Sequence, residues 1–285
     1  MAAEDFVEVP YDGSFSLAET LKSGQLFHWE PIEVEGHFGY AGCIGNAAPS
    51  FITQEAGGKV LTFARDQSHV SRYFGLDTPL LEVHATFPQK DAVLAAAIAY
   101  CPGLRITRQP MWECLSTFIT SSLKQVVHIR AISMTLRQRY GVAHSLGDRV
   151  FFTYPTPEAL AAAGEEALRS CSLGYRAKSL HLAALAVVRG EVDLPAIEAE
   201  PSLADARAGL MQLHGVGEKI ANCALLFSAG KWQAFPIDVW IERILRDHYR
   251  KRLKGVRLQA WAEKHFGVNA GYAQQYLFHF ARKTL

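Results

Sequence analysis

The sequence has few cysteines and lacks both a long apolar run and a targeting signal. The five cysteines among its 285 residues are scattered and form no Cys-x-x-Cys pair, so we expect neither disulfides nor a cysteine-ligated structural zinc. No stretch reaches the roughly 20 apolar residues that cross a bilayer, and the N-terminus has neither a basic n-region nor an apolar h-region. We therefore expect no membrane partner and a reducing compartment, which is the cytoplasm and nucleoid of a bacterium or the nucleus of a eukaryote. The cysteines are Cys43, Cys101, Cys114, Cys171 and Cys223.

The sequence also lacks an excess of charge of one sign. Its 29 Lys and Arg residues and 28 Asp and Glu residues give a net charge of +1, so a DNA-binding face must come from a local basic patch. Hydrophobic residues make up 49% of the chain, which is enough to bury a full core in one large domain or two modest ones. Two basic clusters, at 176–178 and 250–254, are either phosphate-binding or ordinary solvated faces.

The texture of the chain changes near residue 88. Short runs at 38–44, 50–53 and 59–63, separated by Gly, Asn and Pro, predict an antiparallel sheet. From Asp91 onward, amphipathic stretches predict helices as far as the C-terminus. The sequence thus predicts an α+β fold, with a sheet subdomain at 1–88 and a helical domain at 89–285.

A glycine turn at 213–219 lies between two predicted helices. Because glycine has no Cβ and accepts positive φ, Gly215 and Gly217 allow a sharp turn whose backbone N–H groups can meet a nucleic-acid phosphate. Helix-hairpin-helix units of this kind also occur in polymerases, ligases and nuclease subunits, where they only hold phosphate. The hairpin therefore predicts DNA binding without specifying catalysis.

A lysine and an aspartate add chemistry to this hairpin. Lys219 lies at the start of the second helix, where the positive end of the helix disfavours an ammonium group and so favours a nucleophilic amine. Asp238 follows 19 positions later, just after Pro236, where a new helix is expected to begin. Its carboxylate can cap that helix, stabilise a sugar cation, or do both. The combination predicts cleavage of a glycosidic bond.

The segment that contains Lys219 and Asp238 resembles the helix-hairpin-helix, Gly/Pro, Asp (HhH-GPD) signature of the DNA glycosylase superfamily. The resemblance is strongest to the 8-oxoguanine DNA glycosylases with associated lyase activity, and it extends from about Ser23 to Phe278. It implies that the N-terminal antiparallel sheet is an integrated subdomain, packed on a mostly α-helical HhH-GPD body, rather than a separate binding module. Further matching motifs lie at 23–29, 103–109, 113–114, 173–178 and 270–278.

The resemblance implies an enzyme that flips a damaged base out of duplex DNA. Lys219 would attack C1′ of the sugar and form a Schiff base that leads to strand cleavage, while Asp238 would stabilise the sugar cation. No cysteine follows Cys223, so the iron–sulfur cluster of some relatives is not expected. A monovalent cation held by hairpin carbonyls is the one ion implied. No zinc site is expected, because the eleven histidines form no zinc-binding motif.

The resemblance also assigns four residues to the pocket for the flipped base. Gly24 would accept, through its carbonyl, the N7 hydrogen that only an oxidised purine carries. Gln274 and Phe278, four residues apart on the last predicted helix, would bond the edge of the base and stack on its face, and Cys223 would cover the other face. Taken singly, Phe278 and Cys223 are typical core residues. Their joint match with Gly24 and Gln274 favours the pocket.

The residues that fill the gap in the DNA depart from the family pattern. Where relatives carry Ser-Ser-Asn-Asn-Asn and then an arginine, this chain has Ser-Ser-Leu-Lys-Gln-Val-Val-His from Ser121 to His128. Leu123 replaces the asparagine that enters the base stack, although leucine can serve as an apolar wedge. His128 replaces the arginine, so one reader of the orphaned cytosine is missing.

Two matches and one further departure complete the expected DNA-binding set. Tyr175 and Arg176 match the residues that press on the distorted strand and read the orphaned cytosine. The basic cluster at 176–178 lies beside them and is the better candidate for phosphate contact. Trp240 stands where relatives have a histidine near the phosphate of the flipped nucleotide, so this chain departs from the family pattern at that contact.

The sequence as a whole predicts a monomeric DNA glycosylase with AP lyase activity. It would remove 8-oxoguanine from double-stranded DNA, with a relaxed preference for the opposite base. An alkylpurine glycosylase of the same superfamily is the alternative that Leu123 favours and that Lys219, Gly24 and Gln274 oppose. A DNA-damage binding protein without catalysis is opposed by the pairing of Lys219 with Asp238.

Overall fold

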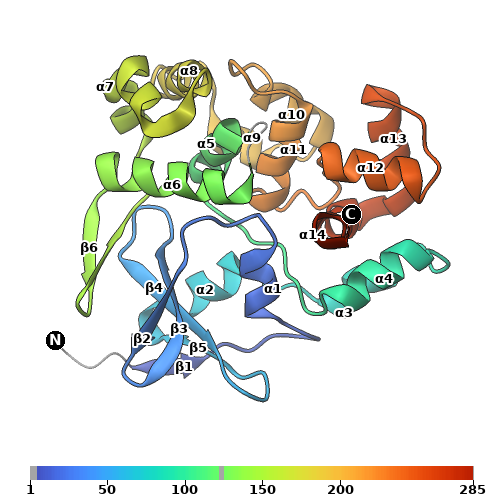
Figure 1. Cartoon of the computed structure of the whole chain (residues 1–285), viewed down its shortest axis with the longest axis horizontal. Helices are drawn as coiled ribbons and strands as arrows, with labels where there is room; N and C mark the ends of the chain where they lie inside the picture. The colour runs from blue at the N-terminus through green and yellow to red at the C-terminus, as the bar shows by residue number, and fades with distance from the viewer. Residues whose placement is uncertain (1–4, 122–124, 285) are drawn as a thin grey trace.

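The computed structural model describes residues 5–121 and 125–284, so Leu123 lies outside the described residues. Figure 1 shows an antiparallel sheet, drawn in blue, beneath a larger body of helices drawn in green to red. The predicted α+β fold, with an N-terminal sheet on a mostly helical body, is confirmed.

The five-stranded sheet is formed by the first quarter of the chain. Its strand order is β1-β5-β4-β3-β2, and every neighbouring pair is antiparallel. The runs predicted at 38–44, 50–53 and 59–63 correspond to β3, β4 and β5. The strands are β1 (Phe6–Glu8), β2 (Glu30–Val34), β3 (His37–Cys43), β4 (Pro49–Gln54) and β5 (Val60–Phe63).

The strand-like texture of this region did not predict three short helices. They have six or seven residues each, too few for a 3.6-residue pattern to repeat, and they form in the context of the tertiary packing. A local cap sets the start of the first of them: the Ser16 hydroxyl accepts the N–H of Glu19 at 3.2 Å. The helices are α1 (Leu17–Lys22), α2 (Gln67–Tyr73) and α3 (Leu80–Ala85), with a 3-10 turn at Ala64–Asp66.

A β-hairpin inside the helical part joins that part to the sheet. The sequence pattern did not predict it, because each of its strands has only four residues. Phe151 shares a buried cluster with Phe51 and Phe63 of the sheet, and Arg149 Nη2 lies 2.6 Å from Glu30 Oε2. Figure 1 shows the hairpin reaching down beside β2. The sheet is therefore integrated with the helical body, and the hairpin strands are β6 (Ala143–Leu146) and β7 (Arg149–Phe152).

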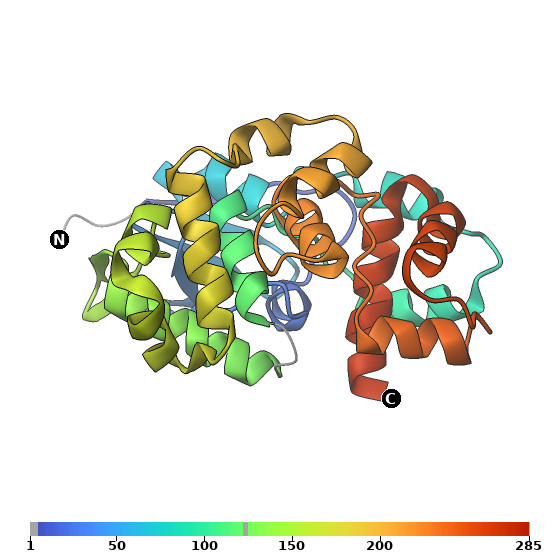
Figure 2. The same ribbon diagram turned by 90° about the horizontal axis from the view of Figure 1, so that it is seen from above.

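The helical body occupies the rest of the described chain. Figure 2 shows α5 and α8 side by side, with α14 next to α12. Gly164 has a φ of +80° and kinks α7. The helices are α4 (Ala92–Tyr100), α5 (Met111–Ser121), α6 (Val126–Tyr140), α7 (Pro157–Leu168), α8 (Arg176–Val188), α9 (Leu194–Ala199), α10 (Leu203–Leu210), α11 (Glu218–Phe227), α12 (Val239–Asp247), α13 (Gly255–Phe266) and α14 (Ala270–Thr284), with a π-helical turn at Arg169–Leu173 and a 3-10 turn at Gly267–Asn269.

A buried ion pair closes the junction between sheet and helices. Glu113 of α5 pairs with Arg137 of α6, which also donates to the carbonyl of Phe152 at 3.1 Å. His28, just before β2, places Nδ1 3.5 Å from Glu113 Oε1. Burial, reinforced by the charge of Arg137, holds the pKa of His28 well below its ordinary value, so the imidazole is neutral. The segment that leads from Gly24 into the sheet is thereby fixed against the helical body.

Candidate active site

The glycine hairpin joins α10 to α11. Gly215 has a φ of +80°, and a Cβ there would lie 2.3 Å from the Ser179 hydroxyl, so both backbone and packing require glycine. Gly217 differs from the expectation of positive φ. Its φ is −99°, because it is the extended N-cap of α11. Nothing lies within 4 Å of the position that its Cβ would take, so this glycine leaves a bare surface, and no side chain caps the first N–H groups of the helix.

Lys219 lies in the first turn of α11. Its Nζ is 3.4 Å from the hydroxyl of Ser121 and 5.3 Å from the ring centre of Phe118. Both neighbours belong to the last turn of α5, which packs against α11. The amine is therefore held at the end of α5.

Asp238 is the N-cap of α12. Its Oδ1 accepts the N–H groups of Trp240 at 3.0 Å and Ile241 at 2.9 Å, and these bonds fix the carboxylate. Burial raises the pKa of this carboxyl group above its ordinary value, while the backbone N–H groups and the charge of Lys219 offset part of the rise. Asp238 thus caps the helix and carries a half-buried carboxylate close enough to Lys219 for their charges to interact.

Gly24 is held by hydrogen bonds to the residues on either side of it. Gln275 of α14 donates to the carbonyl of Ser23 at 3.0 Å. The Gln25 side chain donates to the carbonyl of Arg105 at 2.7 Å and accepts the N–H of Thr107 at 2.9 Å. Gly24 itself has a φ of +84°, a conformation that side chains disfavour. The N-terminal segment is therefore locked against α14 and the strand-like connection before α5.

Two adjoining cavities bring the predicted residues together. The larger cavity, of about 850 Å³, is open and includes Gly24, Lys219, Asp238 and Phe278 in its lining. The smaller has a volume of about 40 Å³, room for about three water molecules, so a purine enters only after side chains move apart. Six residues singled out in the sequence line this smaller cavity: Gly24, Lys219, Cys223, Asp238, Gln274 and Phe278.

Two polar groups in the smaller cavity are poised for a ligand. Gln274 is 4% exposed, and its Oε1 has no hydrogen-bond partner within the described residues. Such a buried acceptor costs about 1–3 kcal/mol until a donor reaches it. Burial raises the pKa of the Cys223 thiol to about 11, so this side chain presents a neutral, polarizable surface.

Arg282 was not singled out in the sequence. It lies one turn after Phe278 on α14, lines the larger cavity, and places its guanidinium carbon 5.4 Å from the Phe278 ring centre. Its Nη2 donates to the carbonyl of Lys22, whereas its Nη1 is buried with no partner in the described chain. That Nη1 lies 2.8 Å from the point that a Cβ on Gly24 would occupy. The four-residue spacing from Phe278 was the signal that the sequence offered.

The residues assigned to the gap and the opposite strand do not converge in this way. His128 is exposed on the first turn of α6, Tyr175 is 61% exposed, and Trp240 lines the larger cavity. Arg176 is only 7% exposed. It donates to the carbonyl of Leu173 at 3.4 Å and lies 4.4 Å from the ring centre of Tyr175. Arg176 therefore packs inward and must turn outward before it can read a base.

The described residues contain neither a metal-binding cluster nor a membrane-spanning helix. In these ranges, no three His, Cys, Asp or Glu side chains gather as a metal site. The five cysteines are buried and unpaired. No helix between residues 5 and 121 or between 125 and 284 has both the length and the apolar character needed to cross a bilayer.

Two family models match adjoining regions of the chain. Residues 9–115 match the family described as "8-oxoguanine DNA glycosylase, N-terminal domain", and residues 117–257 match the "HhH-GPD superfamily base excision DNA repair protein". A solved structure reported as MBOgg1 in complex with a low-affinity DNA ligand is 32% identical, with a TM-score of 0.88, over 99% of this chain and 96% of that one. The chain belongs to the HhH-GPD superfamily.

Two further relatives resemble this superfamily member over nearly their full length. The 8-oxoguanine glycosylase/lyase of Clostridium acetobutylicum, solved with double-stranded DNA containing cytosine opposite 8-oxoguanine, is 26% identical with a TM-score of 0.87, over 99% of each chain. A probable N-glycosylase/DNA lyase of Methanothermobacter thermautotrophicus is 29% identical over 95% of each chain.

The cavity of this HhH-GPD protein draws on both matched regions. Gly24 lies in the first region, whereas Lys219 and Asp238 lie in the second. Gln274 and Phe278 lie beyond residue 257, on the helix α14 that packs against α4 and α12. The site therefore depends on how the N-terminal segment and the last helix are held together.

Proposed function

We propose that this protein is a DNA glycosylase with AP lyase activity that removes 8-oxoguanine from duplex DNA. The observation that carries the proposal is the convergence of Lys219 and Asp238 with the buried, unsatisfied Oε1 of Gln274 at one cavity. The relatives described as N-glycosylase/DNA lyases and 8-oxoguanine glycosylase/lyases support it, because they match nearly the whole chain.

Lys219 supplies the nucleophile. After losing a proton, its Nζ forms a bond to C1′ as the bond from C1′ to N9 of the base breaks, and the base leaves with that electron pair and gains a proton. Nζ then loses a second proton, the C1′–O4′ bond of the sugar ring breaks as O4′ gains a proton, and a protonated Schiff base forms between Nζ and C1′. Loss of a proton from C2′ and cleavage of the C3′–O3′ bond complete the β-elimination. The hydroxyl of Ser121, 3.4 Å away, orients the amine.

Asp238 stabilises the positive charge that develops on the sugar. Its Oδ1 is already fixed by two backbone N–H groups, so the carboxylate needs no reorganisation when the bond breaks. Preorganised charge of this kind contributes roughly 100- to 1,000-fold in rate.

The flipped base would lie between Phe278 and Cys223. The Gly24 carbonyl accepts N7–H of 8-oxoguanine, a hydrogen that guanine lacks, and Gln274 Oε1 accepts an N–H from another edge of the base. Arg282 adds a contact that the sequence did not suggest. Because its Nη1 is buried beside Gly24, it can donate to a carbonyl oxygen of the base.

The opposite strand is read with fewer polar groups. Leu123 serves as an apolar wedge, His128 offers at most one donor or acceptor, and Arg176 reads the orphaned base once it turns outward. Excision is therefore less dependent on an opposing cytosine. The partner is double-stranded DNA containing an oxidised purine, the protein acts as a monomer in the cytoplasm or nucleus, and a monovalent cation bound by hairpin carbonyls is the only ion proposed.

The test is release of base from duplexes that carry 8-oxoguanine, hypoxanthine or an alkylpurine, each opposite all four bases. We expect release of 8-oxoguanine together with borohydride trapping of the protein on the DNA. Release of alkylpurine alone, without trapping, would replace the proposal with the alkylpurine alternative. Binding of lesion DNA without any release would make the protein a damage-binding protein.

A further inference from the structure

A strongly basic surface lies at the end of α12 that is remote from Asp238. Between residues 243 and 257 the chain carries seven Lys and Arg residues and a single acidic residue, although the whole protein has 29 cationic and 28 acidic residues. The cations are Arg243, Arg246, Arg250, Lys251, Arg252, Lys254 and Arg257. Nearly a quarter of the positive charge is therefore concentrated in about a twentieth of the chain.

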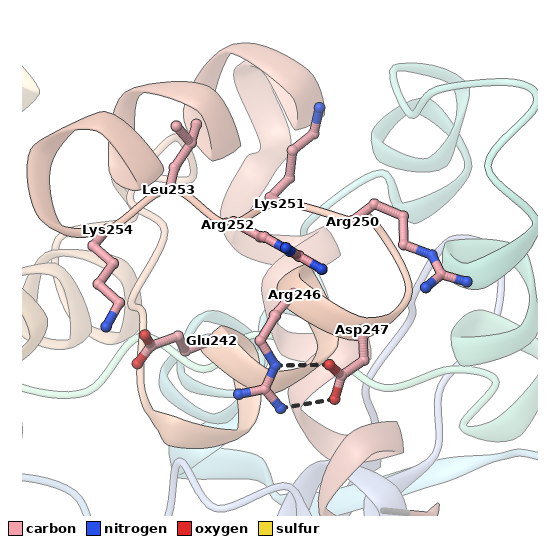
Figure 3. Close-up of a pocket in the computed structure, with 8 residues that line it drawn as sticks. All are labelled: Glu242, Arg246, Asp247, Arg250, Lys251, Arg252, Leu253 and Lys254. Atoms are coloured by element: carbon pink, nitrogen blue, oxygen red, sulfur yellow. Dashed lines mark hydrogen bonds and ion pairs between the residues drawn. The ribbon is translucent and has the colours of Figure 1, made fainter.

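The end of α12 and the following loop surround a hollow of about 570 Å³. Figure 3 shows Arg246 of α12 and Arg252 of the loop beside this hollow, and Lys251 pointing away from it. Lys251 lies over the ring of Trp261 at 4.6 Å, and its N–H donates to the carbonyl of Leu245 at 2.9 Å. These contacts fix the loop against the end of α12 and against α13.

Three cations of the hollow have no acidic partner. Arg246 forms a two-point ion pair with Asp247, at 2.7 and 2.9 Å, which neutralises its charge. No ion pair involves Arg250, Arg252 or Lys254 within the described residues, and all three are exposed. We call these three residues the α12–α13 basic cluster. An ordinary solvated face disperses or pairs its charges, whereas this cluster concentrates them around a concave surface.

The α12–α13 basic cluster is continuous with the active site along one face of α12. Val239 is 67% exposed and lines the large cavity. Glu242 and Arg246 follow at helical spacing on the same face and line the hollow. The nine residues of α12 extend about 14 Å, which corresponds to about four nucleotides along one strand of B-DNA.

We propose that the α12–α13 basic cluster binds the phosphate backbone of the same duplex, about four nucleotides from the flipped one. The inference rests on the proposed action on duplex DNA. Guanidinium and ammonium groups bind phosphate oxygens without reading sequence. The cluster therefore extends the footprint of the enzyme and strengthens binding to damaged and undamaged duplex alike, without entering the chemistry.

The test compares the salt dependence of binding for two charge-matched variants. The first is Arg250→Asn/Arg252→Gln/Lys254→Gln, in which asparagine suits the left-handed φ of +58° at position 250. The control is Lys59→Gln/Arg72→Gln/Arg189→Gln, which also removes three exposed cations. They lie in the turn before β5, in α2 and at the C-terminal end of α8, whereas Arg176 begins that helix. The double variant Arg252→Gln/Lys254→Gln checks that any loss does not come from the backbone change.

The DNA probes contain a tetrahydrofuran abasic site, which cannot be cleaved, and are followed by fluorescence anisotropy. The long duplex has about 12 base pairs on each side of the abasic site. Each of the two shorter duplexes keeps only about three base pairs on one side, and the shortened side differs between them. We expect the cluster variant to lose about tenfold in affinity on the long duplex and to lower the slope of log K against log salt by about two to three. One of the shorter duplexes lacks the base pairs that would reach the loop between α12 and α13. The cluster variant and the wild type should bind that duplex with equal affinity.

Three outcomes would overturn the proposal: an unchanged salt slope on the long duplex, an equal loss in the control variant, or an equal loss on all three duplexes. Single-turnover release of 8-oxoguanine at saturating protein should stay at the wild-type rate in the cluster variant. Failure of the wild type to release 8-oxoguanine would overturn the proposed function separately, because the binding assay on the abasic probe does not depend on base release.

Discussion

The two sides of the active site differ in how completely they are assembled. On the lesion side, six residues from the N-terminal segment, α11, the start of α12 and α14 line one cavity. On the side of the opposite strand, His128 is exposed and Arg176 packs inward against Leu173. The residues assigned to catalysis and to the base are therefore already gathered at one cavity, whereas those assigned to the orphaned base are not.

The difference follows from how each group is supported. Asp238 is fixed by two backbone N–H groups, and the residues flanking Gly24 are fixed by bonds to Gln275, Arg105 and Thr107. These supports come from buried secondary structure that packing holds in place. Tyr175 and His128 lie at helix starts on the surface, where the described residues form no comparable network around them. The residues with rigid support are therefore those assigned to bond cleavage and to the flipped base.

The largest expected effect comes from Lys219→Gln, which removes the nucleophile and keeps a side chain of similar length. Base release and borohydride trapping should both be abolished, while binding to 8-oxoguanine duplex remains within about fivefold, because a single ion pair contributes about 1 kcal/mol or less. Single-turnover release and trapping gels measure both. Undiminished trapping in the variant would mean that another amine acts.

Asp238→Asn should lower base release by about 100- to 1,000-fold while preserving the fold. Asparagine keeps an oxygen that can accept the N–H groups of Trp240 and Ile241, so the cap of α12 survives. Because burial raises the pKa of Asp238, the neutral side chain should leave the melting temperature at neutral pH unchanged or higher. If the variant instead has a clearly lower melting temperature and its loss of rate follows from unfolding, Asp238 acts only as a helix cap.

The same pKa shift predicts an acid limb in the wild-type rate. The carboxylate must be ionised to stabilise the sugar cation, so base release falls as pH decreases through the raised pKa. This limb should lie above the pKa of about 3.9 of an ordinary aspartate and should be absent in Asp238→Asn. The pH profile of single-turnover release between pH 4 and 8 measures it.

Gln274→Ala and Phe278→Ala should each weaken discrimination of 8-oxoguanine from guanine by about 1–3 kcal/mol, or roughly 5- to 150-fold. Both residues face the base, so affinity for undamaged duplex should change little. The ratio of release rates from 8-oxoguanine and guanine duplexes reports the effect. If both variants keep the full preference, the base does not bind at this cavity.

Arg282→Leu tests the contact that only the structure suggested. Loss of one hydrogen bond to the base should slow release of 8-oxoguanine by about 5- to 10-fold. Lys283→Gln is the matched control, because Lys283 is an exposed cation that lines the same large cavity. An equal loss in both variants would indicate that overall charge matters and that Nη1 of Arg282 makes no specific contact.

The sequence singled out six of the residues that gather at the smaller cavity, because they belong to contiguous motifs. The hairpin, Lys219 and Asp238 lie within 26 positions, and local rules for turns and helix starts apply to each. Arg282 was missed because its importance comes from proximity to Gly24, which is remote in sequence. The β6–β7 hairpin and the helices α1 to α3 were missed because elements of four to seven residues depend on tertiary packing.

The smallest expected effect concerns the base opposite the lesion. Reading an orphaned cytosine requires donors to its O2 and N3, and here only Arg176 remains of the usual asparagine and two arginines. A protein discriminates strongly between opposing bases only when the wrong base leaves buried polar groups of the protein unpaired. This chain lacks most of those groups, so the penalty for a wrong opposing base is smaller. Release opposite thymine, guanine or adenine should therefore stay within about tenfold of release opposite cytosine.

The measurement is single-turnover release from four duplexes that differ only in the opposing base. Leu123→Asn alone should leave the weak preference unchanged, because one amide cannot replace the missing arginine. Leu123→Asn combined with His128→Arg should strengthen the preference for cytosine, since the guanidinium restores donors that a mismatch leaves unsatisfied. A strict cytosine requirement in the wild type would contradict this account, and Gln125, which lines the large cavity from the N-cap of α6, would then be the first residue to test as the reader.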